Sequence, residues 1–91
     1  MPLYALICTD RPDGLETRKA TREAHLAYVR ETGAVALAGP LLDKAGEMAG
    51  SLIVLDLPDR AAAEAWAAAD PYARAGLFAE VRLQEWRKVI G

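Results

Sequence analysis

Apolar segments alternate with clusters of turn-forming residues along the chain. The first segment, residues 3–9, is compatible with a β-strand, and the turn formers of residues 10–14 end it. Residues 15–32 contain no Gly or Pro, are rich in Ala, Leu, Glu and Arg, and stop at Gly33. This pattern predicts a helix that ends at a glycine, the residue type most often found just after a helix.

The helix predicted over residues 15–32 carries a stripe of small and aromatic side chains at helical spacing. We expect this stripe to pack on the sheet, and its members are Ala20, Ala24, Ala27 and Tyr28. A step of about 100° per residue places His25 at the edge of the stripe, on the side that carries Arg18, Arg22 and Val29.

Residues 34–57 predict two strands joined by a hairpin turn. We expect the first strand, residues 34–42, to end near Gly39-Pro40, because proline cannot donate to a central sheet ladder. Residues 43–47 supply the turn, and residues 48–57 form the next strand. Residues 52–55 are apolar at consecutive positions, so both faces of this strand require cover.

The last third of the chain predicts two helical segments and a strand. Asp59 is the expected N-cap of a helix over residues 60–69. Its buried stripe consists of Ala63, Trp66 and Ala67. Asp70 then caps a short helical segment over residues 71–76, because a proline after a capping residue suits the first position of a helix. Residues 79–90 form a long final strand with a register change along it.

The order β-α-β-β-α-(short α)-β predicts one α+β domain over residues 1–91, with the split βαβ arrangement of ferredoxin-like folds. Its two main helices cover only one face of the sheet. Because residues 3–8 and 52–55 are apolar on both sides, the other face would expose a larger apolar patch than soluble monomers usually carry. We therefore expect a homodimer that packs sheet against sheet.

Composition and charge exclude several classes of function. The 91 residues carry 11 Lys and Arg against 13 Asp and Glu, a net charge of −2, so we expect no nucleic-acid partner. No apolar run approaches the ~20 residues of a membrane-spanning helix, so we expect no membrane partner. A single cysteine permits no disulfide within the chain, which favours a cytoplasmic location, as does the lack of a signal-peptide pattern.

Cys8 and His25 are the only residues of their types. Cys8 has no His or basic cluster near it in sequence, which indicates a buried thiol rather than a nucleophile. One His and one Cys cannot fill the ligand set of a zinc site without carboxylates or a second subunit, so we expect no metal. The sequence contains no phosphate-binding glycine motif, and we expect no cofactor.

His25 and Asp70 are the two candidates for chemistry. Histidine as a residue type titrates near neutrality and can carry a proton, although a single His at the edge of a helix stripe is also a common structural residue. Asp70 has a structural role as a helix cap, and capping favours the ionised carboxylate, which makes it a poor general base. A capped carboxylate suits the partner that orients an imidazole and stabilises its protonated form.

The remaining polar candidates each allow two interpretations. Arg18 and Arg22 lie one helical turn apart and could bind a substrate carboxylate, or form a solvated face with the nearby Glu16 and Glu23. Ser51 could face a pocket or satisfy a local backbone group.

Several segments match a known family in identity, spacing and order. They are Arg22-Glu23-Ala24-His25-Leu26, Ala38-Gly39-Pro40, Gly50-Ser51, and Ala65-Trp66-Ala67-Ala68-Ala69-Asp70-Pro71-Tyr72 followed by Ala75-Gly76. On these segments the chain resembles the YciI-like proteins over nearly its whole length. The resemblance implies a ferredoxin-like fold of the dimeric α/β-barrel type, a homodimer, and a pocket centred on a histidine/aspartate pair.

Carried over by motif, the resemblance assigns roles to individual residues. The motifs give His25 and Asp70 as the catalytic pair and Gly39, Pro40 and Ser51 as the framework of the pocket. With Arg18 and Arg22 from the helix and Tyr72 after Asp70, these residues make up the expected substrate site. Some relatives look like enzymes that isomerise or dehydrohalogenate ring compounds. The loop at residues 43–48 is compact here, whereas some family members carry a longer insertion at the rim of the pocket.

Two functions from different classes follow from the sequence. The first is a small enzyme that performs cofactor-independent acid–base chemistry, of isomerase, lyase or hydrolase type, on a small and perhaps anionic or cyclic molecule. The second is a module that binds a small ligand or partner in the same pocket without turnover. A third interpretation uses Pro2, because tautomerases employ an N-terminal proline amine as base, but Met1 blocks that amine.

Overall fold

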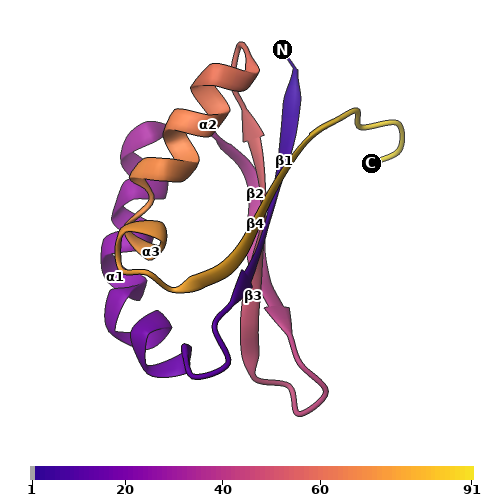
Figure 1. Cartoon of the computed structure of the whole chain (residues 1–91). Coiled ribbons are helices and arrows are strands. Elements are labelled where there is room, and N and C mark those ends of the chain that lie inside the picture. The colour runs from indigo at the N-terminus through magenta and orange to yellow at the C-terminus, as the bar shows by residue number, and fades with distance from the viewer. Residues whose placement is uncertain (1) are drawn as a thin grey trace.

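The computed structural model describes residues 2–91 and has the predicted element order (Figure 1). The elements are β1 (Leu3–Asp10), α1 (Leu15–Thr32), β2 (Val35–Leu42), β3 (Met48–Asp56), α2 (Arg60–Ala69), α3 (Pro71–Arg74) and β4 (Phe78–Trp86). The strands form one antiparallel sheet in the order β2-β3-β1-β4. This is the ferredoxin-like α+β arrangement, with the short α3 before the last strand.

The helices all lie on one face of the sheet (Figure 1). Alternation along β1 directs Tyr4, Leu6 and Cys8 toward the helices, where each is buried. Their β3 partners Leu55 and Ile53 are buried on the same side. The core therefore sits between the two central strands and the helices.

Strand β2 corrects the prediction that this segment ends near Gly39-Pro40. The strand continues to Leu42, and Pro40 pairs with Ser51 within it. Proline is tolerated because β2 is an edge strand, where one row of backbone groups has no partner strand to bond.

Strand β4 is shorter than predicted. It spans Phe78–Trp86, and residues 87–91 have no regular structure. The expected register change occurs where β4 meets the end of β1, because Asp10 pairs with Phe78 out of step with the preceding pairs.

Helix α1 has the predicted bounds and ends at Gly33, whose φ of 60° lies in the left-handed region that glycine adopts readily. The predicted sheet-facing stripe is wrong at Ala20 and Ala24, both of which are exposed. The buried residues of α1 are Arg18 and His25 instead. The inward face of α1 carries these polar side chains because each has a buried acidic partner, Asp10 for Arg18 and Asp70 for His25.

Both predicted caps in the last third of the chain are confirmed. The Asp59 carboxylate accepts a hydrogen bond from the Ala62 backbone N–H at 2.8 Å and begins α2. Asp70 does the same for α3, accepting from the Tyr72 N–H at 3.0 Å. Each cap satisfies a backbone donor that the first turn of a helix leaves unpaired.

The face of the sheet away from the helices carries exposed apolar side chains. Leu37 of β2 is 53% exposed and Trp86 of β4 is 42% exposed, and Leu41 also lies on this face. Within residues 2–91, no helix combines the length and hydropathy needed to cross a membrane.

Candidate functional site

A cavity of about 210 Å³ opens between α1, α3 and the β2-β3 hairpin. We call it the His25 cavity. Its lining residues are Arg18, Arg22, His25, Leu26, Ala38, Gly39, Pro40, Met48, Ser51, Ile53 and Tyr72. All six residues expected around the substrate, and His25, therefore line one cavity, while Asp70 lies directly behind His25.

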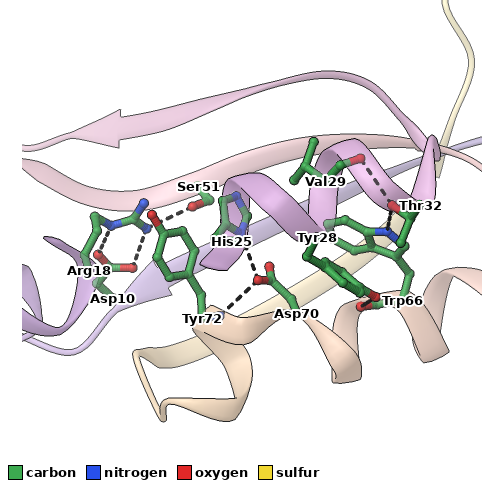
Figure 2. Close-up of polar contacts among 10 residues, drawn as sticks. All are labelled: Asp10, Arg18, His25, Tyr28, Val29, Thr32, Ser51, Trp66, Asp70 and Tyr72. Atoms are coloured by element: carbon green, nitrogen blue, oxygen red, sulfur yellow. Dashed lines mark hydrogen bonds and ion pairs between the residues drawn. The ribbon is translucent and has the colours of Figure 1, made fainter. Parts of the chain in front are cut away.

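His25 and Asp70 meet at the wall of this cavity, forty-five residues apart in sequence (Figure 2). The distance from His25 Nδ1 to Asp70 Oδ1 is 2.8 Å. His25 Nε2, the other ring nitrogen, has no hydrogen-bond partner within residues 2–91. The arrangement gives the imidazole one nitrogen held by a carboxylate and one nitrogen available to a molecule in the cavity.

Asp70 is fully buried, with a side-chain exposure of 0%. Its Oδ1 atom accepts a hydrogen bond from the Tyr72 backbone N–H and is in hydrogen-bond contact with His25 Nδ1. Its Oδ2 atom has no partner in the described part of the chain. A buried carboxylate is stable in its ionised form only when hydrogen-bond donors reach it. A proton on His25 Nδ1 supplies such a donor, so the Asp70 carboxylate and the His25 ring stabilise each other.

Arg18, which also lines the cavity, forms a second buried network. Its guanidinium donates twice to Asp10, at 2.7 and 2.9 Å, and once to the Ser51 hydroxyl at 2.9 Å. Burial lowers the pKa of Arg18, but its hydrogen bonds and charge interaction with Asp10 outweigh this and raise the pKa overall. Arg18 is therefore a fixed cation, and Ser51, which accepts from it, retains its own proton to donate.

Tyr72 contacts both networks. Its ring stacks on the His25 imidazole with centroids 4.1 Å apart, and the Arg18 guanidinium carbon lies 4.7 Å from its centroid. Burial raises the pKa of the Tyr72 hydroxyl, and the charges of Arg18 and Arg22 oppose this rise without cancelling it. The phenol therefore keeps its proton at neutral pH. The stacked Tyr72 ring fixes the orientation of the His25 ring.

A clamp between α1 and α2 lies about one helical turn from the His25–Asp70 pair. The Tyr28 hydroxyl donates to the Trp66 carbonyl at 2.8 Å, and the Trp66 indole N–H donates to the Thr32 hydroxyl at 2.9 Å (Figure 2). Since α1 carries His25 and the residue after α2 is Asp70, this clamp fixes the two elements that must meet.

Asp10 is the polar residue that sequence reasoning missed. The sequence places it first among the turn formers of residues 10–14, whereas it is the last residue of β1 and 8% exposed. The available signal was alternation, because Asp10 lies on the same side of β1 as the buried Leu6 and Cys8. The apolar walls formed by Leu26, Met48 and Ile53 were also not identified from the sequence.

Two other candidates lie outside the site. Burial, and secondarily the charge of Asp70, raise the pKa of the Cys8 thiol to about 12, which agrees with the interpretation of an unreactive core residue. Pro2 does not line the His25 cavity, and Met1 lies outside the described residues. Within residues 2–91, no group of three or more His, Cys, Asp or Glu side chains is placed to hold a metal ion.

The sequence matches the family of YCII-related domains over residues 2–87. The chain is 35% identical to Protein YciI of Escherichia coli O6:H1 over 97 aligned positions, which cover 97% of this chain and 99% of that protein.

Two solved structures show the same fold. The 5-chloro-2-hydroxyhydroquinone dehydrochlorinase of Burkholderia phenoliruptrix AC1100, in complex with 2,5-dihydroxybenzoquinone, matches with a TM-score of 0.84 and 27% identity, covering 93% of each chain. An antibiotic biosynthesis monooxygenase matches with a TM-score of 0.63 at 12% identity, covering 99% of this chain and 100% of that one. The second likeness concerns the fold alone.

Proposed function

This chain belongs to the family of YCII-related domains, and from this premise we propose that it is an enzyme of cofactor-independent acid–base chemistry on a small molecule. His25 carries the proton, and Asp70 orients the ring. The observation that carries the proposal is the 2.8 Å contact between His25 Nδ1 and the fully buried Asp70 at the wall of a cavity.

The chemistry follows from the two ends of the imidazole. The Asp70 carboxylate accepts from Nδ1–H, which leaves the Nε2 lone pair free to take a proton from a substrate in the cavity. The imidazolium that forms is stabilised by the Asp70 charge beside it. Negative charge left on a substrate oxygen is stabilised by the Arg18 guanidinium and the Ser51 hydroxyl. Asp10 holds the Arg18 guanidinium in place but does not line the cavity itself.

The size of the cavity and one structural relative support a ring compound as the substrate. A cavity of about 150 Å³ holds a benzene ring, so the 210 Å³ here fits one ring with small substituents. The dehydrochlorinase, which is 27% identical, was solved with a dihydroxybenzoquinone. We infer an isomerase, lyase or hydrolase reaction in which a ring carbon or hydroxyl loses a proton to His25.

The test is an assay with 5-chloro-2-hydroxyhydroquinone as first substrate and 2,5-dihydroxybenzoquinone as ligand. Chloride release and solvent deuterium exchange into the ring are measured for the wild-type protein, His25→Gln and Asp70→Asn. We expect His25→Gln to lose ~100-fold or more in rate and Asp70→Asn to fall between it and the wild-type protein. Saturable binding with no His25-dependent reaction of either kind would instead establish the ligand-binding alternative.

We also infer that the protein is a homodimer that packs its open sheet faces together. The exposed Leu37, Leu41 and Trp86 support this arrangement, because burying them removes apolar surface from water. The cytoplasmic location stays a prediction that rests on the single, buried Cys8.

A further inference from the structure

Arg22 is a cation that the reaction proposed above does not use. It lies on α1 one turn before His25 and one turn after Arg18, so the three side chains follow one another along the same side of the helix. Unlike Arg18, it is exposed, and it forms no ion pair or hydrogen bond with any of residues 2–91. Its charge is therefore available to a ligand.

Arg22 differs from Arg18 and His25 in having no acidic partner beside the His25 cavity. Arg18 is held by two bonds to Asp10, and the buried Asp70 contacts His25 rather than Arg22. No Asp or Glu lines the cavity, although acidic residues outnumber basic ones in the chain by 13 to 11. Arg22 is therefore a cation of the cavity lining that no carboxylate among residues 2–91 contacts.

We propose that Arg22 is the specificity determinant of the His25 cavity and selects substrates with a permanent carboxylate on the ring. This inference rests on the proposed function, because it takes the cavity as the substrate site. A guanidinium matches a carboxylate with two parallel hydrogen bonds, and one unpaired guanidinium balances one negative charge. The apolar walls of Leu26, Met48 and Ile53 then hold the ring between the carboxylate and His25. The preferred substrates are small monocyclic carboxylic acids whose other ring substituents carry the reacting proton, and rings without a carboxylate, such as the hydroxyhydroquinone above, bind more weakly.

The test measures charge preference with matched pairs of probes of nearly equal shape. The pairs are benzoate with benzamide and para-hydroxybenzoate with para-hydroxybenzamide, titrated by NMR at neutral pH into the wild-type protein, Arg22→Gln, Arg22→Lys and Lys19→Gln. Lys19 is the matched control, because it is an exposed cation on the same helix that does not line the cavity. We expect each carboxylate to outbind its amide by ~10-fold or more in the wild-type protein and Lys19→Gln. Arg22→Gln should reduce the ratio to about two-fold or less, and Arg22→Lys should restore part of it.

Equal affinity of carboxylate and amide in the wild-type protein would overturn the proposal, and so would the absence of binding by both carboxylates at millimolar concentration. A preference that survives in Arg22→Gln would also overturn it. His25→Gln separates this inference from the proposed function. It should keep the carboxylate preference while abolishing proton exchange. The carboxylate preference therefore tests the role of Arg22, and proton exchange tests the role of His25.

Discussion

Removal of the Asp70 carboxylate tests two roles at once, because the same oxygen caps α3 and holds His25. Asp70→Ala removes the cap, which costs ~0.5 to 2 kcal/mol, and leaves a buried ring N–H without a partner, which costs ~1 to 3 kcal/mol. Loss of the unpartnered Oδ2 offsets part of this. We expect a net loss of about 2 kcal/mol in the free energy of unfolding.

Two further variants separate the roles of Asp70. Asp70→Ser restores the cap through its hydroxyl but not the contact with His25, so it should recover about half of the loss. Asp70→Asn keeps a carbonyl oxygen for both donors and should lose less than about 1 kcal/mol while losing the charge that stabilises an imidazolium. Urea denaturation followed by circular dichroism measures all three variants. An Asp70→Ala protein within about 0.5 kcal/mol of the wild-type protein would refute the reasoning.

Four other predictions follow from the packing of the chain. Tyr28→Phe breaks the bond to the Trp66 carbonyl and should cost ~0.5 to 1.5 kcal/mol in urea denaturation, with no loss if the clamp is unimportant. Gly50→Ala places a Cβ against the Cys8 carbonyl oxygen, which separates β1 from β3 and should destabilise the fold by ~1 to 3 kcal/mol; an unchanged midpoint would contradict the packing. Since burial raises the pKa of Cys8 from 9.0 to about 12, the folded state holds the thiol proton more tightly, and stability should fall as pH rises from 9.0 toward 12. Thiol reagents at pH 8 should therefore react only after unfolding, and fast reaction with folded protein would disprove the burial. Sedimentation at micromolar concentration should give about twice the chain mass, whereas a folded monomer would remove the sheet-to-sheet argument.

Local signals in the sequence were sufficient for the element order and the caps. Asp59 and Asp70 each precede a helix that they cap, because capping depends on neighbours two or three residues away. Gly33 ends α1 for the same kind of local reason. The pocket around His25 and Asp70 was expected only from the likeness of the chain to a known family, because neither composition nor periodicity indicates that these two residues lie close together.

Features that depend on tertiary neighbours could not be predicted locally. Pro40 breaks a strand only if that strand is central, and the edge position of β2 is a property of the whole sheet. Arg18 was expected on a surface or beside a substrate, yet Asp10 makes its burial possible through a pair of charge-assisted bonds. The alanine stripe does not mark the inward face of α1, because Arg18 and His25 are buried there through their contacts with Asp10 and Asp70.

The proton position on His25 is the most direct test of the central claim that Asp70 presents Nε2 to the cavity as a base. The chain contains one histidine, so its ¹⁵N-labelled imidazole gives signals that need no assignment. At a pH where the ring is neutral, we predict a proton on Nδ1 and a bare Nε2, with Asp70→Ala losing this preference. A wild-type ring protonated on Nε2, or a tautomer unchanged in Asp70→Ala, would contradict the account.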